Sequence, residues 1–380
     1  MEVDKNRLVA TLQSLIKIPS FENSLAISGF VKKELEGMGH TVFSDEDGNI
    51  ITEIGDGSGF ILNAHLDTVA PGEVWSKDPF AGVVEGGKVY GRGASDCKAG
   101  VAGMIEIARM LAKDKPTKRV VLTFTAFEEG YPLEKNGVYR LIKKLKCIER
   151  GISMESTTTG DTIGISIGCR GSANYIIDII GKRGHSAYAK PEDNPINKVP
   201  DLMKEISRIP KSKLHIKSID EHVEDANIVT EIVAKEGQNV VPGKCRLSVN
   251  RRSLPDEGPE EFLPKLKAAC KKALGKDFRI EQESGIQGYI FDDRGFLELC
   301  KKTIREAGAK PLPKFEMARI DSSILHNFAG IGTFMMGPGS AMQAHTIDEY
   351  CEIDGLVKAT EAVLGLIRKW DESVEFVPIC

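Results

Sequence analysis

Segments with helical periodicity alternate with segments typical of buried strands, and their order indicates the fold class. Leu8, Leu12 and Leu15 share one face of a predicted helix, and a second strongly helical pattern covers residues 99–112. Residues 119–127 (RVVLTFTAF) are typical of a strand that is buried on both faces. Helices that alternate with such strands are typical of α/β proteins. We therefore expect an α/β fold with a mostly parallel sheet.

This alternation changes after Gly171. From there to residue 287 the patterns run strand, helix, strand, strand, helix, strand, which is the order of a ferredoxin-like α+β unit. Alternating α/β character then returns, with helical patterns at 295–307 and 356–369. We therefore predict one α/β domain interrupted by an inserted domain: residues 1–172 form its first part, residues 173–287 the ferredoxin-like insertion, and residues 288–380 its second part.

Charge and hydropathy restrict the kinds of partner. The 380 residues include 51 Lys plus Arg and 55 Asp plus Glu, which gives a net charge of −4. Because binding to phosphates requires a clear basic excess, we expect no nucleic-acid partner. No stretch approaches the roughly 18 apolar residues that span a bilayer, and the N-terminal segment does not resemble a signal peptide. We therefore expect a cytoplasmic protein with no membrane partner.

Two histidines and three carboxylates follow predicted strands or lie in glycine-rich loops, where open α/β sheets bind their ligands. They are His65, Asp96, Glu129, Glu155 and His345. Each has an ordinary alternative when taken singly, as a solvated strand end or, for Asp96, as the N-cap of the helix near Ala99. Together they suit a pair of zinc ions with one carboxylate bridging them. The sequence therefore predicts a two-metal hydrolytic site.

Two further carboxylates lie beside these candidates. Asp67 follows His65 by two residues, and such positions face the same way in a strand, so Asp67 can orient the imidazole. Glu128 directly precedes Glu129 after the predicted strand at 119–127. One of two adjacent carboxylates can bind metal while the other acts as a general base. A solvated acidic loop is the alternative for this pair.

With these motifs in place, the chain resembles the zinc-dependent family of acetylornithine deacetylase, succinyl-diaminopimelate desuccinylase, aminoacylase-1 and carboxypeptidase G. The resemblance covers essentially the whole chain in the family's motif order. It rests on HLDT (65–68), GRGASDCKAG (91–100), EEG (128–130), GHSA (184–187) and GPGSAMQAHTIDEY (337–350).

The resemblance implies a metal role for each of the five candidates. His65 and Glu155 are similar to the ligands of one zinc, and Glu129 and His345 to those of the other. Asp96 is similar to the carboxylate that bridges them. The resemblance therefore implies two Zn²⁺ per chain, and Co²⁺ or Mn²⁺ suits the same nitrogen and oxygen ligands.

It also implies the roles of their neighbours. Glu128 matches the general base, and Asp67 the residue that holds His65. The peptide bond after the bridging aspartate is often cis in this family, which here is the bond between Asp96 and Cys97. Cys97 stands where the family usually has a bulkier or polar residue, and we expect its thiol to be neutral.

The inserted domain resembles the family's lid, which mediates dimerisation, so a homodimer is expected. His185 resembles the histidine that reaches the active site and stabilises the oxyanion. Arg252 resembles the arginine that binds the substrate carboxylate, although the sequence leaves the choice between Arg251 and Arg252 open. Asn227 matches a lid asparagine that contacts the substrate or the oxyanion.

The function implied is cleavage of the amide bond of a small N-acyl amino acid by a dinuclear zinc hydrolase, with Glu128 as proton carrier. A di- or carboxypeptidase that acts on short peptides is the alternative, because the shared motifs do not separate the two. A non-catalytic binding or scaffold relative is more remote, since every ligand position and the base are filled. The segment near Asp321 matches the family's substrate loop only loosely.

Overall fold

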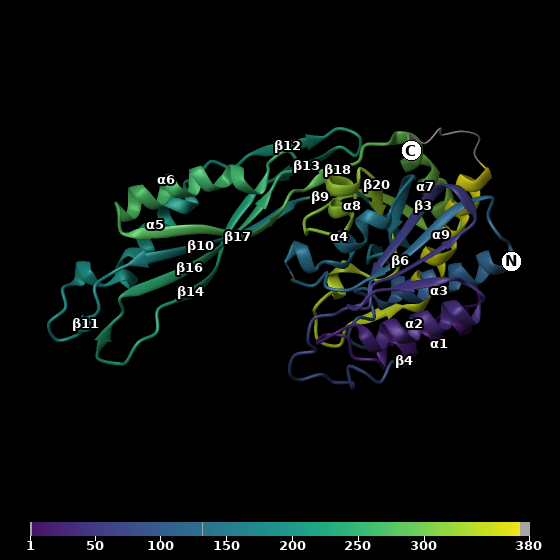
Figure 1. Cartoon of the computed structure of the whole chain (residues 1–380), viewed down its shortest axis with the longest axis horizontal. Coiled ribbons are helices and arrows are strands. Elements are labelled where there is room, and N and C mark those ends of the chain that lie inside the picture. The colour runs from purple at the N-terminus through teal and green to yellow at the C-terminus, as the bar shows by residue number, and fades with distance from the viewer. Residues whose placement is uncertain (1, 131, 373–380) are drawn as a thin grey trace. The chain divides into compact units, whose positions relative to one another are not determined.

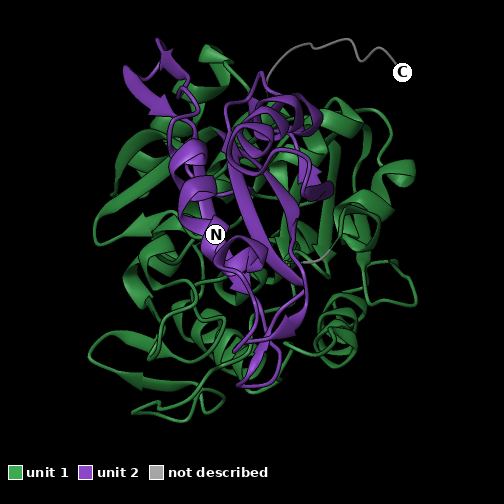
Figure 2. Ribbon diagram, turned by 90° about the vertical axis from the view of Figure 1, so that its left-hand side faces the viewer, with its two compact units in different colours: residues 1–168, 291–315, 320–380 green, residues 169–290, 316–319 purple. Residues whose placement is uncertain are grey.

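The computed structural model describes residues 2–130 and 132–372, which divide into two compact units (Figure 1, Figure 2). Unit 1 comprises residues 1–168, 291–315 and 320–380, and unit 2 comprises residues 169–290 and 316–319. The insertion predicted at 173–287 lies within unit 2. The short segment 316–319, distant in sequence, was not predicted to belong to it.

Unit 1 is built around a sheet whose central strands run parallel. In spatial order these strands are β6 (Lys118–Thr125), β3 (Asp56–His65), β7 (Ile148–Ser153) and β20 (Gly332–Met335). Antiparallel pairings extend the sheet: β2 (Ile50–Ile54) pairs with β6, β1 (Val42–Ser44) with β2, and β9 (Thr162–Cys169) with β20. The strands β8 (Thr158–Thr159) and β19 (Lys310–Glu316) pair with β9. The predicted α/β fold with a mostly parallel sheet is confirmed.

Amphipathic helices cover this sheet. The group that packs helix on helix consists of α1 (Lys5–Ile16), α2 (Leu25–Gly37), α3 (Lys98–Lys113), α7 (Arg294–Glu306) and α9 (Ile353–Glu372). In α1 the Asp4 carboxylate accepts a hydrogen bond from the Arg7 N–H, and Leu8, Leu12 and Leu15 are fully buried, as the sequence predicts. Two shorter helices, α4 (Gly137–Leu141) and α8 (Ser322–Ala329), pack on each other.

A small second sheet in unit 1 joins segments that are distant in the chain. It consists of β4 (Val83–Glu85), β5 (Lys88–Tyr90) and β21 (Tyr350–Glu352), with β5 in the middle. Because β21 pairs with β5, the chain around His345 is brought beside the loop that leads to Asp96.

Unit 2 has a four-stranded antiparallel sheet. Its spatial order is β14 (Ala226–Val233), β16 (Lys244–Ser253), β10 (Gly171–Ile180) and β17 (Phe278–Ile286). Helices α5 (Val199–Ser207) and α6 (Leu263–Leu274) pack against it over a core that includes Tyr175, Leu202, Leu247 and Leu266. The chain order β10-α5-β14-β16-α6-β17 is that of a ferredoxin-like unit.

Several short elements were not predicted. They are the hairpin β12 (Lys213–Ile216) and β13 (Glu221–Glu224), the pair β11 (Gly184–His185) and β15 (Val240–Val241), the strand β18 (Tyr289–Ile290) and the one-turn 3₁₀ helices η1 (Leu133–Lys135), η3 (Pro191–Asp193) and η6 (Ala341–Gln343). Such elements are too short to show a clear periodicity. The 3₁₀ helices η2 (Ile142–Lys144), η4 (Pro195–Lys198) and η5 (Pro259–Phe262) instead directly adjoin α4, α5 and α6, in segments where helices were expected.

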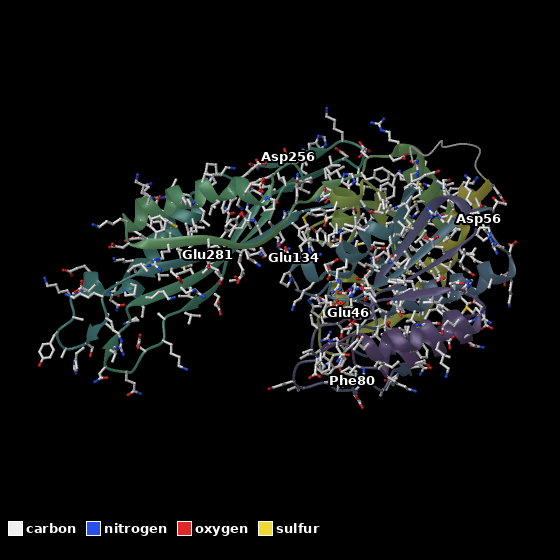
Figure 3. The ribbon with its side chains drawn as sticks, viewed as in Figure 1. Glu46, Asp56, Phe80, Glu134, Asp256 and Glu281 are labelled. Atoms are coloured by element: carbon white, nitrogen blue, oxygen red, sulfur yellow. The ribbon has the colours of Figure 1, made fainter. Side chains whose placement is uncertain are left out.

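Charged side chains cover the surface of each unit. Glu46, Asp56 and Glu134 in unit 1 and Asp256 and Glu281 in unit 2 are exposed examples (Figure 3). Among the described residues, no helix combines the length and the apolar composition that crossing a membrane requires.

Candidate metal centre

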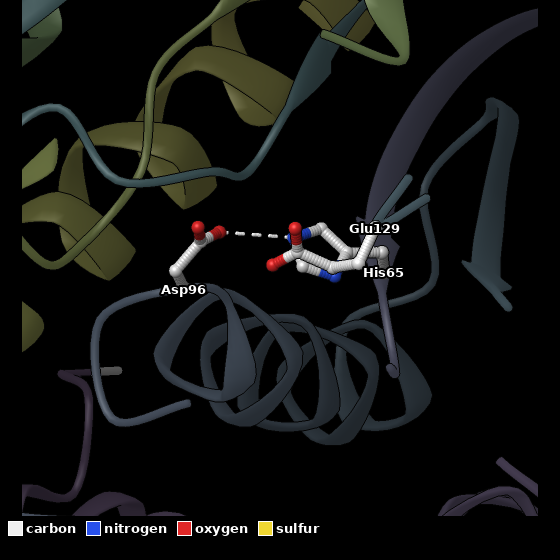
Figure 4. Close-up of side chains that lie close together, drawn as sticks. All are labelled: His65, Asp96 and Glu129. Carbon is white, nitrogen blue, oxygen red and sulfur yellow. Dashed lines mark hydrogen bonds and ion pairs between the residues drawn. The ribbon is translucent and has the colours of Figure 1, made fainter. Parts of the chain in front are cut away.

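Three predicted ligands meet at the carboxyl ends of neighbouring parallel strands in unit 1. His65 is the last residue of β3, Glu129 follows β6, and Asp96 lies in the loop before α3. One ligand atom from each of the three lies within 4.8 Å of the others (Figure 4). Since β3 and β6 pair in parallel, their ends deliver His65 and Glu129 to the same edge of the sheet.

The buried imidazole of His65 lies between two aspartates. Its Nε2 is 3.0 Å from Oδ1 of Asp96, and its Nδ1 is 2.9 Å from the main-chain carbonyl oxygen of Asp67. The Asp67 carboxylate is 3.8 Å from Nδ1, too far for a hydrogen bond. Asp67 therefore contacts His65 through its main-chain carbonyl, and its carboxylate lies within ion-pair distance of the same ring nitrogen.

The carboxylate of Asp67 instead holds the segment that carries the two adjacent glutamates. Its Oδ1 accepts from the Glu128 N–H at 3.2 Å, and its Oδ2 accepts from the Glu129 N–H at 2.9 Å. Burial raises the pKa of Asp67, although the charge of His65 and these two N–H donors act in the opposite direction. One residue thus orients the imidazole of His65 and fixes the backbone of Glu128 and Glu129.

Asp96 lies between two histidines and presents a different carboxylate oxygen to each. Oδ1 faces Nε2 of His65 at 3.0 Å, and Oδ2 lies 3.5 Å from Nε2 of His345. Burial by itself raises the pKa of Asp96, but the hydrogen bonds from His345 and His65 outweigh it and hold this pKa well below its usual value. The carboxylate is therefore kept ionised between two imidazoles.

The alternative role for Asp96, as the cap of the following helix, is not seen. The helix α3 begins at Lys98 and the residue at its N-cap position is Cys97. The peptide bond between Asp96 and Cys97 is cis, as the family resemblance implies. The Cys97 thiol is buried and donates to the carbonyl oxygen of His65 at 3.4 Å, and burial raises its pKa to about 12. These values agree with the neutral thiol expected there.

His345 connects Asp96 with Glu129. Its Nε2 is 2.9 Å from Oε1 of Glu129, in addition to its contact with Asp96. The hydrogen bonds with Asp96 and Glu129 raise its pKa to about 10. His345 is about half exposed, with 52% of its side chain accessible, whereas His65 is almost fully buried.

Glu155 follows the end of β7 by two residues and lies close enough to His65 and Asp96 to interact with their charges. Its buried carboxylate accepts from the Ser153 hydroxyl at 2.8 Å. Burial raises the pKa of Glu155 to about 7, while the charge of His65 acts in the opposite direction and that of Asp321 adds to the increase. Glu155 thus interacts electrostatically with His65, the residue with which it is expected to share a metal ion.

Asp321, in the segment that matches the family's substrate loop only loosely, belongs to a buried hydrogen-bond network in unit 1. It is fully buried, and its carboxylate accepts from the side chains of Asn136 at 2.9 Å, Asn63 at 3.3 Å and Thr125 at 3.3 Å. This buried network ties α4 and the start of α8 to β3 and β6. The sequence gave no sign of this network, because the hydrogen-bond partners of Asp321 come from separate segments of the chain.

The candidates of the inserted domain occupy contrasting environments in unit 2. His185 is exposed on the short strand β11, where its Nδ1 accepts from the Ala187 N–H at 3.1 Å. Arg251 is fully buried and forms ion pairs with Asp225 at 2.6 Å and with Glu257. Its Nη1 also donates to Oδ1 of Asn227 at 2.9 Å. Arg251 is therefore committed to contacts inside unit 2.

Arg252 points the other way, because neighbouring residues of β16 face opposite sides of the sheet. It is partly buried and forms no ion pair with any residue that the structure describes. Burial lowers the pKa of Arg252, and the positive charges of Arg319 and Arg170 lower it further. Arg252 thus lies close enough to two other arginines of unit 2 for their charges to act on it, while Arg170 also interacts with the carboxylates of Asp225 and Glu224.

Comparisons with known proteins agree with this geometry. Residues 61–369 match the model of the peptidase family M20/M25/M40. The succinyl-diaminopimelate desuccinylase of Rhodopseudomonas palustris (strain HaA2) is 27% identical over 386 residues, which cover 94% of this chain and 97% of that protein.

Two solved structures share the fold. The di-peptidase Dug1p of Saccharomyces cerevisiae superposes with a TM-score of 0.79 at 15% identity, covering 98% of this chain and 97% of its own. The YXEP protein of Bacillus subtilis, described as a dinuclear metal binding peptidase of the M20 family, superposes with a TM-score of 0.74 at 16% identity, covering 97% of this chain and 99% of its own.

The family match and the cluster of His65, Asp96 and Glu129 lead to one conclusion. The chain belongs to the peptidase family M20/M25/M40 and is a metallohydrolase of amide bonds.

Proposed function

We propose that this protein cleaves the amide bond of a small N-acylated amino acid with two divalent metal ions. The observation that carries this proposal is the position of Asp96, whose two carboxylate oxygens each face a different histidine. A carboxylate that bridges two ions needs this arrangement, with further ligands on either side. His345 and Glu129, 2.9 Å apart, supply one side, and His65 with Glu155 supplies the other.

The donor set fits the expected metals. Two imidazoles and three carboxylates are nitrogen and oxygen donors that suit zinc, and also cobalt or manganese. His65 and Glu155 would hold one ion, Glu129 and His345 the second, and Asp96 both. Two bound ions would supply Lewis acidity, which polarises a carbonyl group and makes water a stronger acid.

Glu128 is the proposed general base. It lies beside the ligand Glu129, and the Asp67 carboxylate holds the main-chain N–H of both residues. In this role Glu128 takes a proton from the attacking water and gives it to the leaving amine. His185 is proposed to stabilise the oxyanion, as the family resemblance implies, and its side chain is exposed.

Arg252 is proposed to bind the carboxylate of the substrate. The ion pairs of Arg251 inside unit 2 favour Arg252 of the two neighbours. Asn227 is proposed to contact the substrate or the oxyanion, with its side-chain oxygen held by Arg251 and its amide nitrogen as the donor. The partly buried guanidinium of Arg252 can bind a carboxylate through two parallel charge-assisted hydrogen bonds, and the positive charges of Arg319 and Arg170 act on the same group.

We expect Arg252→Ala to raise KM for a substrate with a free carboxylate by about 10- to 100-fold, since a charged hydrogen bond contributes about 1.5–3 kcal/mol. The kcat should change much less. Steady-state kinetics on the free acid and its methyl ester measure this, and the ester should not distinguish the variant from wild type. Arg246→Ala, on the same strand but paired with Asp178, is the control. An unchanged KM for the free acid would contradict the assignment.

A di- or carboxypeptidase is the second candidate, favoured by the structural likeness to a di-peptidase. The relatives named succinyl-diaminopimelate desuccinylase favour the deacylase. A panel of acetyl-, succinyl- and aminoacyl-amino acids separates the two, because the preferred acyl group identifies the reaction.

We expect the purified protein to contain two metal ions per chain and to lose all cleavage of this panel when a chelator removes them. Adding zinc, cobalt or manganese should restore the activity, since the proposed ligands offer donors to each. Elemental analysis beside the activity assay measures both quantities. A protein with neither bound metal nor metal-restored activity would point to a binding or scaffold role.

We also propose that unit 2 acts as a lid and forms a homodimer, and that the enzyme works in the cytoplasm. The dimer rests on the family resemblance together with the edge strand β14. Its side chains Ile228, Ile232 and Val233 are 50%, 47% and 44% exposed, respectively. Exposed apolar residues on an unpaired strand edge favour association with another strand.

A further inference from the structure

Glu349 is a buried carboxylate that no proposed step uses, and it is attached to the loop that carries Asp96. None of its surface is accessible. Its Oε2 accepts from Nη1 of Arg92 at 2.8 Å and from the Gly93 N–H at 2.9 Å. Its Oε1 accepts from the N–H groups of Ser95 at 2.8 Å and Asp96 at 3.0 Å. Four donors from residues 92–96 thus converge on one side chain.

This arrangement fixes the backbone that presents Asp96. An ionised carboxylate is expensive to bury unless its oxygens are fully hydrogen-bonded, and here each oxygen accepts two hydrogen bonds. Because three of the donors are main-chain N–H groups, the loop cannot change its backbone dihedral angles without breaking them. The last of these donors is the N–H of Asp96 itself.

Glu349 also belongs to the segment that supplies His345. It follows His345 by four residues and immediately precedes β21. The main chains meet at the same place, since the Gly91 N–H donates to the Glu349 carbonyl oxygen at 2.9 Å and the Ser95 hydroxyl donates to that of Tyr350 at 2.8 Å. The loop of Asp96 and the segment of His345 are therefore joined at Glu349.

We propose that Glu349 is a positioning residue of the metal centre, which sets Asp96 and His345 at the separation that a shared metal ion requires. This inference rests on the proposed two-metal function, because it concerns the ligands of that site. The hydrogen bonds that the Glu349 carboxylate accepts come from Arg92 and the loop backbone, and its charge also repels that of the Asp96 carboxylate. Its substitution should therefore change metal affinity and ligand geometry as well as stability.

Glu349→Gln is the sharpest test, because it keeps the shape of the side chain. All four partners are donors, and glutamine has a single acceptor oxygen. Whichever way the amide turns, its NH₂ group faces two donors that lose their acceptor. We expect metal affinity to fall by about 10- to 100-fold, the range for groups that orient metal ligands. Competition with a chromophoric chelator measures this, and the absorption spectrum of the Co²⁺-loaded protein should change.

Glu106→Gln is the matched control. Glu106 is also buried, accepts from Arg7 and Arg109, and lies among helices without touching a proposed ligand. We expect this variant to lower stability in the presence of chelator while Co²⁺ affinity and spectrum stay as in wild type. An equal loss of affinity in both variants would show a general effect of stability and overturn the inference.

Glu349→Asp gives a second measurement if the glutamine variant does not fold. It keeps an ionised acceptor but shortens the side chain by one methylene group. We therefore expect its metal affinity to lie between those of wild type and Glu349→Gln. If Glu349→Gln does not fold, the expectation is an affinity below that of wild type. Wild-type affinity and spectrum in the foldable variants would overturn the positioning role while leaving the proposed function intact. A wild-type protein that binds no metal would overturn both.

Discussion

Replacing Glu128 with glutamine is expected to lower kcat by about 10²- to 10⁴-fold while the metal content stays near that of wild type. Glutamine cannot accept the proton from water or deliver it to the leaving amine. The Glu128 side chain is not among the proposed ligands, and its main-chain N–H bond to Asp67 survives the change. The site should therefore keep its shape and lose its proton carrier.

Steady-state kinetics on the preferred substrate, together with elemental analysis, test this expectation. Glu134→Gln serves as the control, since Glu134 is an exposed glutamate in the nearby helix η1. Its kinetics should match wild type. Retained turnover in Glu128→Gln would refute the assignment of the base, and loss of metal would show that Glu128 acts as a ligand.

Arg251→Ala is expected to lower the free energy of unfolding by about 3–5 kcal/mol, the usual cost of removing one partner from a buried ion pair. Asp225 has no accessible side-chain surface, and Glu257 is 10% exposed. Both carboxylates would lose the guanidinium that compensates for their burial. The effect should appear in unit 2, where all three residues lie.

Urea unfolding of the two variants at neighbouring positions provides the comparison. Arg252→Ala should leave stability nearly unchanged, since Arg252 forms no ion pair with the described residues, and should affect KM instead. Arg251→Ala should show a large loss of stability, together with any effect on KM that follows from releasing the Asn227 side chain. Equal stability of the two variants would contradict the division of roles between these adjacent arginines.

The alternation of helix and strand patterns was enough to predict the α/β fold, because the spacing of apolar residues that distinguishes a helix from a strand involves only residues near one another in the chain. Leu8, Leu12 and Leu15 show the buried face of α1 without knowledge of what covers it. The metal-ligand candidates were visible for a similar reason. His65 and Glu129 follow strands that could be recognised individually, and parallel strands bring their ends to one edge.

The supporting contacts could not be predicted in this way. Sequence spacing suggested that Asp67 holds His65, but it gave no sign that the same carboxylate also accepts from the main chain beyond β6. The two arginines at 251 and 252 were indistinguishable until the fold placed Asp225 and Glu257 on one side of β16. Asp321 drew attention only through a loose motif, and its three partners come from separate segments.

Local sequence thus determined the fold class and the types of residue available for metal chemistry, because both depend on short-range periodicity and on donor chemistry. Tertiary structure decided which groups orient those residues. Glu349 and the loop at 92–96 are more than 250 residues apart and share no motif or period. Only the pairing of β21 with β5 brings them together, and the need to satisfy a buried carboxylate then fixes their contact.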